Sequence, residues 1–354
     1  MTIDAGGTWS EADTTPSHVE EALRALLSEQ HAREDSYVPA RVLNLVVVAD
    51  REWRGEIYNR LENVGRYHPS RTILCTVEPG RRTIDATVTL TSEGDPRPNE
   101  LALTRERVVL DVGPHHLPKL DTIVDPLVVT DLATLVWAPH GHAEAIDALL
   151  KLSQVVLVDS VNEPDAAAAI KRAKELAREA YVVDLAWLRS TPWRERVAAT
   201  FDPPTWREDL GRITGVTVRH SPDAAAAGVL FCGWLSSRLG WKPGPLMEAR
   251  GALRGKAHGR RQDVDLRLQP ELRQSVPGLA GITIETASGM ALSLDRGRGG
   301  LAAKRRTRDG KESSWTVLGA SRGEAGILGE GIRQALLRDP TYRPALDCAE
   351  AMLA

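Results

Sequence analysis

Cysteine is scarce in this chain of 354 residues, and the three cysteines, Cys75, Cys232 and Cys348, lie far apart in the sequence. Their number is odd and no C-x-x-C pair occurs, which argues against a disulfide framework and against a cysteine-based zinc site. Such cysteine usage is typical of a reducing compartment. We therefore expect a cytoplasmic protein without a structural metal.

A surplus of charge of one sign and long apolar runs are also lacking. Lys and Arg number 45 against 48 Asp and Glu, a net charge of -3, so the overall field attracts neither nucleic acid nor an anionic membrane. The longest apolar run, VLNLVVVA, is too short to span a bilayer, and the polar, acidic N-terminus does not resemble a signal peptide. We predict no membrane partner and no nucleic-acid partner.

Glycine-rich nucleotide motifs are missing where they would be needed. The apolar stretch at 41–50 predicts a buried strand, yet it is followed by REWRGE and not by G-x-G-x-x-G. The motif G-x-x-x-x-G-K-[ST] is absent as well. The sequence therefore predicts no dinucleotide or other cofactor, and we assign no catalytic residue.

Residues 16–204 have the pattern of an α/β domain, in which apolar segments alternate with amphipathic helices. This alternation favours a mainly parallel sheet flanked by helices on both faces. Residues 1–15 are expected to form a loose N-terminal tail. The apolar segments that predict buried strands are 41–50, 72–77, 132–139 and 154–160.

The pattern changes after residue 204, and we place a smaller α+β domain at 205–354. Its later segments alternate polar and apolar residues, which predicts an antiparallel meander with one face in water. The basic, glycine-rich segment 296–308 is predicted to be the tip of a turn. It could contact nucleic acid, but no aromatic platform is interleaved with it. The alternating segments are 263–269, 281–295 and 313–319.

Polar residues follow several predicted strands, at the edge of an open α/β sheet where ligands usually bind. They are Asp50, His140, His142, Asp159 and Ser160. The H-x-H pair could hold a metal, but no third ligand is suggested nearby, and Asp at a strand end commonly caps a helix. Two interpretations stay open: loops with a structural role, or a crevice through which the protein binds a sugar phosphate or acts on it as an enzyme.

The segment GRYHPSR at 65–71 places two arginines, a histidine and a serine close together. Read alone, it could hold a phosphate. It joins a predicted helix to the next strand, however, so it lies at the amino-terminal edge of the sheet, opposite the usual ligand side. A structural or partner-contacting role is therefore favoured.

A second distinctive segment, DLAWLRSTPWRERVAATFDPP at 184–204, concentrates tryptophan and arginine around one Thr-Pro step. Thr191 can cap a helix that has Pro192 in its first turn. Trp193 and the apolar residues four and eight positions later then fall on one stripe. No nucleophile–base pair is visible, so catalysis is the weakest explanation. A buried stripe with an arginine rim and a docking surface rich in Trp and Arg both fit the pattern.

Five segments, taken in chain order, resemble the OpcA family of glucose-6-phosphate dehydrogenase assembly proteins. They are ARVLNLVVVA, GRYHPSRTILC, ATLVWAP, QVVLVDS and VVDLAWLRSTPWRERVAATFD. The likeness covers most of 40–220 and continues more loosely through the C-terminal domain. Its most specific motifs are HPSR and W-x-R-x-T-P-W-R.

The resemblance implies a non-catalytic cytoplasmic protein that binds glucose-6-phosphate dehydrogenase and promotes its active oligomer in the oxidative pentose phosphate pathway. The stretch VVTDLAT before VWAP departs from the proline-rich run that is more usual in the family, so no interface is assigned there. With three scattered cysteines, no redox control is carried over. The matching motif positions, whose roles stay open, are His68, Pro69, Ser70, Arg71, Trp187, Thr191, Pro192, Trp193 and Arg194.

Overall fold

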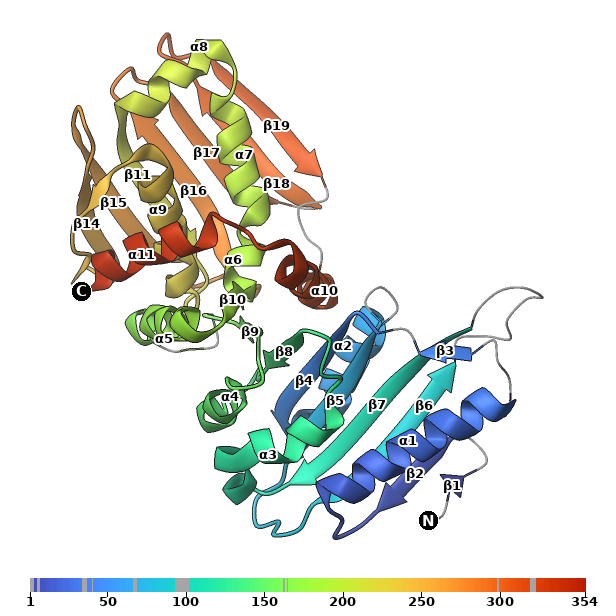
Figure 1. The fold of residues 1–354 in the computed structure, drawn as a ribbon. Helices are drawn as coiled ribbons and strands as arrows, with labels where there is room; N and C mark the ends of the chain where they lie inside the picture. Colours follow the sequence, from blue (N-terminus) through green and yellow to red (C-terminus); the bar gives the residue numbers. More distant parts are fainter. Residues whose placement is uncertain are drawn as a thin grey trace. The chain divides into compact units, whose positions relative to one another are not determined.

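The computed structural model describes residues 3–4, 7–33, 37–39, 41–65, 69–92, 102–161, 163, 165–297, 299–318 and 323–354. The chain separates into two compact units. Unit 1 comprises residues 1–158 and 179–183, and unit 2 comprises residues 159–178 and 184–354. Each unit is built on one large sheet (Figure 1).

Unit 1 alternates strands with short helices. Its strands are β1 (Ile3–Asp4), β2 (Thr8–Glu11), β3 (Tyr37–Pro39), β4 (Leu43–Asp50), β5 (Ser70–Val77), β6 (Asp85–Ser92), β7 (Ala102–Val112), β8 (Thr134–Trp137), β9 (Val155–Val158) and β10 (Tyr181–Asp184). Its helices are α1 (Pro16–Arg33), η1 (Arg51–Trp53), α2 (Arg54–Gly65), η2 (Pro114–Lys119), α3 (Leu120–Val124), η3 (Asp125–Leu127) and α4 (Ala143–Leu149).

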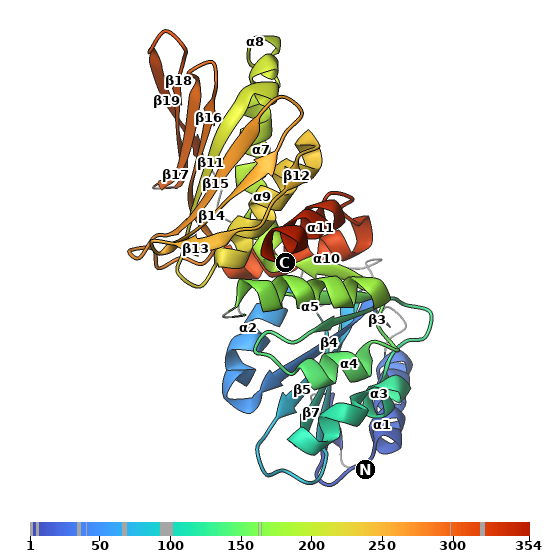
Figure 2. The ribbon, with the colours of Figure 1, turned by 90° about the vertical axis from the view of Figure 1, so that its left-hand side faces the viewer.

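The strands of unit 1 are ordered β1-β2-β6-β7-β5-β4-β8-β9-β10, and β3 pairs with β7. Strands β7, β5, β4, β8 and β9 run parallel to one another, whereas β6, β2 and β1 extend the sheet beyond β7 in antiparallel fashion. Seven of the eight residues of β4 are buried, as expected for a central strand covered on both faces. Figure 2 shows α2 on one face and α1 and α3 on the other. The predicted mainly parallel sheet flanked by helices is confirmed.

Unit 2 begins with helices and continues into a second sheet. Its helices are α5 (Ala166–Glu179), α6 (Leu185–Arg189), α7 (Thr191–Phe201), α8 (Pro204–Arg207), η4 (Glu208–Arg212), α9 (Ala225–Leu239), α10 (Gly323–Leu337) and α11 (Tyr342–Leu353). Its strands are β11 (Ile213–His220), β12 (Lys242–Pro243), β13 (Met247–Ala249), β14 (Ala252–His258), β15 (Asp263–Pro270), β16 (Leu279–Thr286), β17 (Ala291–Gly297), β18 (Gly300–Arg306) and β19 (Glu312–Leu318).

The sheet of unit 2 has the order β12-β14-β15-β11-β16-β17-β18-β19, and β13 pairs with β14. Strands β16 to β19 form an antiparallel meander, in which the predicted segments 281–295 and 313–319 take part. The predicted segment 263–269 is β15, which lies outside this meander as the parallel neighbour of β11. Helices α7 and α9 cover one face (Figure 2). On β11, residues Val216 and Val218 are buried while Thr217 between them is partly exposed, which is the alternation of a sheet with one wet face.

Helix α9 lies at the centre of the core of unit 2. It is apolar nearly all round because it packs against β11 and β15 on one side and against α11 on the other. Gly233 lets the two helices approach closely, since a Cβ at this position would lie 2.3 Å from the carbonyl oxygen of Ala345. This contact anchors the C-terminal helix on the sheet.

Three expected boundaries differ from the structure. Part of the expected tail is strand β2, which pairs with β6 and buries Trp9, because a lone tryptophan is better placed against a sheet edge than in water. The segment 184–204 belongs to unit 2, since α6 packs on α9 and α10. The segment 296–308, expected as a turn, contains β18, which pairs with both β17 and β19.

Candidate functional site

The carboxyl ends of β4 and β8 bring together three of the predicted crevice residues. Asp50 ends β4, and His140 and His142 lie between β8 and α4. The Nε2 atom of His142 lies 3.2 Å from Oδ1 of Asp50. The His140 ring stacks on Trp53 with 4.9 Å between ring centroids. Gly141 and His142 both have positive φ, at 104° and 58°, so the loop doubles back toward β4.

The environments of these two imidazoles differ. Burial lowers the pKa of His140, more than the nearby Glu56 carboxylate raises it. The Nδ1 atom of His140 is buried and has no hydrogen-bond partner among the described residues. The contact between His142 and Asp50 is short enough for an ion pair but lacks hydrogen-bond geometry. An uncharged imidazole with an unsatisfied nitrogen is thus the feature of this edge that a ligand could use.

This edge does not carry the pattern of a dinucleotide site. Residues Arg51–Trp53 form η1 directly after β4, whereas the dinucleotide fingerprint needs glycine in the tight turn and where the pyrophosphate approaches. Trp53 is 41% exposed. Over the described ranges, no group of three or more His, Cys, Asp or Glu side chains is placed to hold a metal ion.

Asp159 and Ser160, predicted in the same crevice, belong to unit 2 and have partners there. Arg189 donates to both carboxylate oxygens of Asp159, at 2.8 and 2.7 Å. The Ser160 hydroxyl donates to Oδ2 of Asp184 at 2.5 Å, and its N–H donates to Oδ1 at 3.2 Å. Burial raises the pKa of Asp184 to about 6 although these hydrogen bonds oppose the shift. Both predicted residues therefore contribute to the internal packing of unit 2.

The HPSR motif lies at the start of β5 in unit 1. His68 is outside the described residues, and Pro69 directly precedes the strand. Ser70 is buried, with its hydroxyl 3.2 Å from that of Thr72. Arg71 is only 9% exposed. The described part of the motif is therefore built into the unit and is not a free surface loop.

Arg71 is held by a buried carboxylate. Its Nε donates to Oε2 of Glu106 on β7 at 2.6 Å, and its Nη1 donates to the carbonyl oxygen of Leu127 at 2.9 Å. Glu106 is 2% exposed and also accepts from Nε of Arg41 at 2.5 Å. Burial lowers the pKa of Arg71, and the charge of Glu106 opposes that shift. A buried charge is tolerated because it is paired and hydrogen-bonded in this way.

The second motif forms the turn between α6 and α7. Trp187 lies in α6 and is buried. Helix α7 begins at Thr191, with Pro192 in its first turn as expected and Ser190 in place of Thr191 as the N-cap residue. Trp193 is buried together with Val197 and Phe201, so the apolar stripe predicted from the spacing is present.

Arg194 lies at the centre of this motif and is 8% exposed. Its guanidinium stacks on the Trp187 ring, 3.5 Å from the centroid. Nε donates to Oγ of Ser190 at 3.1 Å and Nη2 donates to Oγ1 of Thr191 at 2.9 Å. Burial lowers the pKa of Arg194 to about 10, and the charge of Asp339 opposes the shift. The arginine therefore stays charged at neutral pH.

Asp339 connects the motif to the C-terminal helices of unit 2. Its Oδ2 accepts a hydrogen bond from Nε1 of Trp187 at 2.8 Å and lies 4.0 Å from Nη1 of Arg194. The ring of Tyr342 packs on Trp187, and its hydroxyl donates to Oδ2 of Asp184 at 3.1 Å. We name Trp187, Ser190, Thr191, Arg194 and Asp339 the Arg194 cluster. Its burial supports a structural role for the motif.

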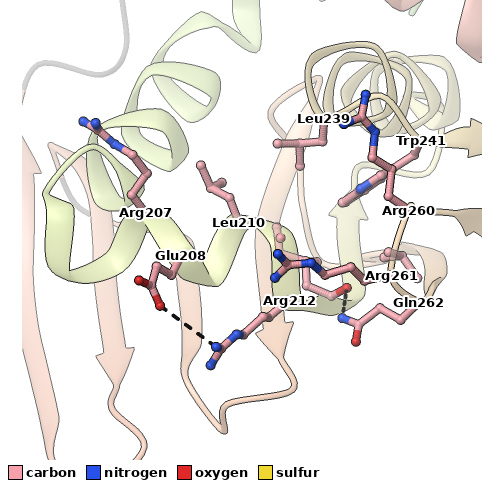
Figure 3. A pocket seen from close by; sticks show the side chains of 13 residues that line it. Arg207, Glu208, Leu210, Arg212, Leu239, Trp241, Arg260, Arg261 and Gln262 are labelled. Carbon is pink, nitrogen blue, oxygen red and sulfur yellow. Dashed lines mark hydrogen bonds and ion pairs between the residues drawn. The ribbon is translucent and has the colours of Figure 1, made fainter.

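An arginine-lined pocket in unit 2 was not predicted from the sequence (Figure 3). It has a volume of about 540 Å³. Its wall includes four arginines from two distant segments, and its apolar residues include Leu239 and Trp241. The segments TWREDLGR and GRRQ each place arginines beside a strand end, but only the fold brings them together. We name it the arginine pocket, with Arg207, Arg212, Arg260 and Arg261 as its cations.

Two family models match this chain. The one described as the glucose-6-phosphate dehydrogenase subunit N-terminal domain matches residues 62–175. The one described as the C-terminal domain of the same subunit matches residues 180–346. Together they cover most of both units. The chain belongs to the OpcA family.

Relatives within the OpcA family are identical to this chain at 26–30% of the aligned residues. The identity is 26% over 201 residues with a cyanobacterial protein of Synechococcus elongatus, covering 55% of this chain and 45% of that one. It is 30% over 131 residues with a protein of Nostoc punctiforme, covering 36% and 28%. Both relatives carry the provisional name OxPP cycle protein OpcA. The chain therefore spans less than half the length of these relatives.

A comparison of structures shows the fold of this OpcA-family chain. The yvaA protein of Bacillus subtilis, provisionally named an oxidoreductase, is 12% identical, with a TM-score of 0.50 over 88% of this chain and 95% of that one. A likeness at this level concerns the arrangement of the strands and helices alone. In the part of the chain that the structure describes, no helix is both long and apolar enough to cross a membrane.

Proposed function

We propose that this OpcA-family chain is a non-catalytic factor that binds glucose-6-phosphate dehydrogenase in the cytoplasm and promotes its active oligomer. The observation that carries the proposal is the match of two glucose-6-phosphate dehydrogenase subunit models, in order, over residues 62–346. Relatives named for the OxPP cycle support the same metabolic setting.

The site in unit 1 supports a role without hydride transfer. The sheet has the strand order and crossovers of a nucleotide-binding fold, but Arg51, Glu52 and Trp53 stand where that chemistry needs glycine. Because a fold alone does not assign a function, the proposal rests on the side chains at this position. NADP binding and hydride transfer would then belong to the dehydrogenase partner.

Differential binding provides a mechanism. A partner shifts an oligomer or conformer equilibrium only by the difference between its affinities for the two states. A chain that binds the active oligomer about 100-fold more tightly than the inactive form would shift their equilibrium by about 2.7 kcal/mol. No chemistry by the chain itself is required.

The rate of glucose 6-phosphate oxidation tests the proposal. The dehydrogenase of the same organism is assayed alone, with an equimolar amount of this chain, and with the chain denatured by heat. We expect a higher rate or a lower KM only with the folded chain, together with co-elution on sizing. Unchanged kinetics and separate elution would contradict the proposal.

A small-ligand site at the carboxyl ends of β4 and β8 is the second candidate. It is favoured by the unsatisfied Nδ1 of His140 beside the exposed Trp53. Binding of glucose 6-phosphate would raise the melting temperature of the chain without the dehydrogenase, and His140→Ala would remove the increase. An unchanged melting temperature at saturating concentrations would remove this candidate.

A further inference from the structure

The arginine pocket lies at the edge of the unit 2 sheet, where the hairpin between β14 and β15 meets the segment that leads into β11. His258 pairs with Asp263 across this hairpin, and the loop between them closes through a hydrogen bond from Gly259 N to Gln262 O at 3.0 Å. The Gln262 side chain donates to the carbonyl oxygen of Ile213 at 2.8 Å. The backbone that carries Arg260 and Arg261 is therefore fixed to β11.

Trp241 braces the hairpin from the other side. A Cβ built on Gly259 would lie 3.4 Å from Cδ1 of Trp241 and 2.8 Å from the carbonyl oxygen of Gln262, so glycine is needed for this close packing. Trp241 is itself nearly buried. The pocket is thus preformed in its backbone and its apolar wall, and preorganisation of this kind lowers the entropic cost of binding.

The arginines of the pocket have few anionic partners. Arg260 and Arg261 are exposed and make no hydrogen bond or ion pair with any residue that the structure describes. Arg212 lies 4.0 Å from Glu208, whose side chain is 83% exposed. Arg207 donates to the carbonyl oxygen of Asp202, which leaves its charge unneutralised. Glu208 is the one carboxylate among the lining residues.

Side chains from the two segments approach each other across the pocket. Figure 3 shows Arg261 extending from the hairpin toward the segment of Leu210 and Arg212. A Cβ on Gly211 would lie 3.8 Å from Nη1 of Arg261, which places this guanidinium beside η4. Arg261 and Arg212 thus bring positive charge into the pocket from two segments that are distant in sequence. An anion bound between these segments would offset that charge.

We propose that the arginine pocket binds a small phosphorylated metabolite, with the guanidinium groups on its phosphate and its organic part against Leu239 and Trp241. A phosphate monoester offers three terminal oxygens and a charge of about -1.5 to -2 at neutral pH on a small centre, which matches the planar fork of arginine. The pocket volume of about 540 Å³ lies within the range of small-molecule sites. This site is independent of the proposed function and lies in a different unit from the edge of β4 and β8.

Isothermal titration calorimetry of the full chain, without the dehydrogenase, tests the proposal with inorganic pyrophosphate as the probe. Arg260→Gln with Arg261→Gln removes two charges from the pocket hairpin. Arg306→Gln with Arg308→Gln removes two exposed charges from the hairpin between β18 and β19 of the same sheet, and serves as the matched control. Circular dichroism verifies that both double variants are folded.

We expect saturable binding of one pyrophosphate per chain. The pocket variant should weaken it by about tenfold or more, since two charge-assisted contacts are lost, and the control by about twofold or less. No saturable heat, or equal weakening in the two double variants, would overturn the proposal. Tighter binding of citrate would indicate a polycarboxylate ligand, and tighter binding of a hexaglutamate peptide would indicate an acidic protein segment. Either of these results would also overturn it.

Discussion

Two groups of arginines in unit 2 have opposite environments. Arg194 belongs to the recognisable TPWR motif, is buried, and has a hydrogen-bonding, stacking or charged partner on every side. Arg260 and Arg261 belong to no motif, are exposed, and lack partners among the described residues. The most distinctive stretch of sequence therefore contributes to the framework, while the free cationic groups lie in a hairpin whose sequence is unremarkable in composition.

This contrast has a physical basis. A buried arginine must satisfy its N–H groups from fixed neighbours, so Ser190, Thr191 and Trp187 have to stand at set spacings from Arg194. Such a requirement produces a local sequence signature. A ligand pocket assembled from segments that are distant in sequence produces none. Arg71 in unit 1 is also buried, but its partner Glu106 lies 35 residues further along the chain on β7, so this pair produces no local signature.

Of the substitutions that test this contrast, replacement of Arg194 should lower the free energy of unfolding the most. Arg194→Ala removes the stacking partner of Trp187 and leaves the half-buried Asp339 without its cation. We expect the free energy of unfolding of unit 2 to fall by about 3–5 kcal/mol, as when one partner of a buried pair is removed. Urea denaturation followed by tryptophan fluorescence measures it.

Arg196→Ala is the matched control for Arg194→Ala, because it lies in the same helix and is only partly buried. It should change the free energy of unfolding by about 0.5 kcal/mol or less. Arg194→Lys keeps the charge but not the planar fork and should give an intermediate loss. Equal stability of Arg194→Ala and Arg196→Ala would show that the cluster is not part of the framework.

The fold was predictable where one local pattern sufficed. The apolar run of β4 and the alternation in β16, β17 and β19 predicted their strands, because burial on two faces or on one produces a characteristic pattern in the sequence. The pairing of β11 with β15 was not predicted, since a parallel neighbour reached through α9 leaves no local trace. Strand β18 was taken for a turn because its glycines and charges obscure the period.

The candidate site was predictable only in part. Asp50, His140 and His142 were expected near one another from the rule for strand ends, and they do approach. Asp159 and Ser160 were grouped with them, but Arg189 and Asp184 engage these two residues inside unit 2. The acidic partners Glu106 and Asp339 were not singled out, because nothing in their local sequence distinguishes a buried carboxylate from an exposed one.

The stability of unit 2 should depend on pH because of its buried carboxyl group, Asp184. Burial raises the pKa of Asp184 from 3.8 to about 6. Between these two pH values, the folded state therefore keeps a proton on this carboxyl group that the unfolded state has released. The stabilisation is complete below about pH 4 and disappears as the pH rises through 6, a decrease of about 3 kcal/mol. Denaturation midpoints from pH 4 to 7, compared with Asp184→Asn, isolate this contribution.

Asp184→Asn should be less stable than the original chain at pH 4, because its amide nitrogen faces the Ser160 and Tyr342 hydroxyls. The difference should narrow toward pH 7, where the original chain carries a buried charge. Parallel stability curves for the two proteins would contradict the raised pKa.

In unit 1, Arg71→Ala should lower the free energy of unfolding by about 2 kcal/mol. The loss is smaller than for Arg194→Ala because Glu106 keeps Arg41 as a partner. Arg41→Ala with Arg71→Ala should cost more than the sum of the two single changes, since the second loss leaves Glu106 buried and unpaired. Additive losses, measured by urea denaturation, would show that Glu106 is satisfied by other groups.

The smallest effect is expected in the arginine pocket and has the opposite sign. Arg260→Gln with Arg261→Gln removes two neighbouring positive charges that have no partner, so the free energy of unfolding should rise slightly, by about 0.5 kcal/mol or less. The gain should shrink as salt is added, because screening weakens the repulsion that it relieves. Thermal melts at low and high ionic strength measure the change. A loss of stability at low salt would mean that these arginines are partnered within the framework, as Arg194 is, and the distinction between the two groups would fail.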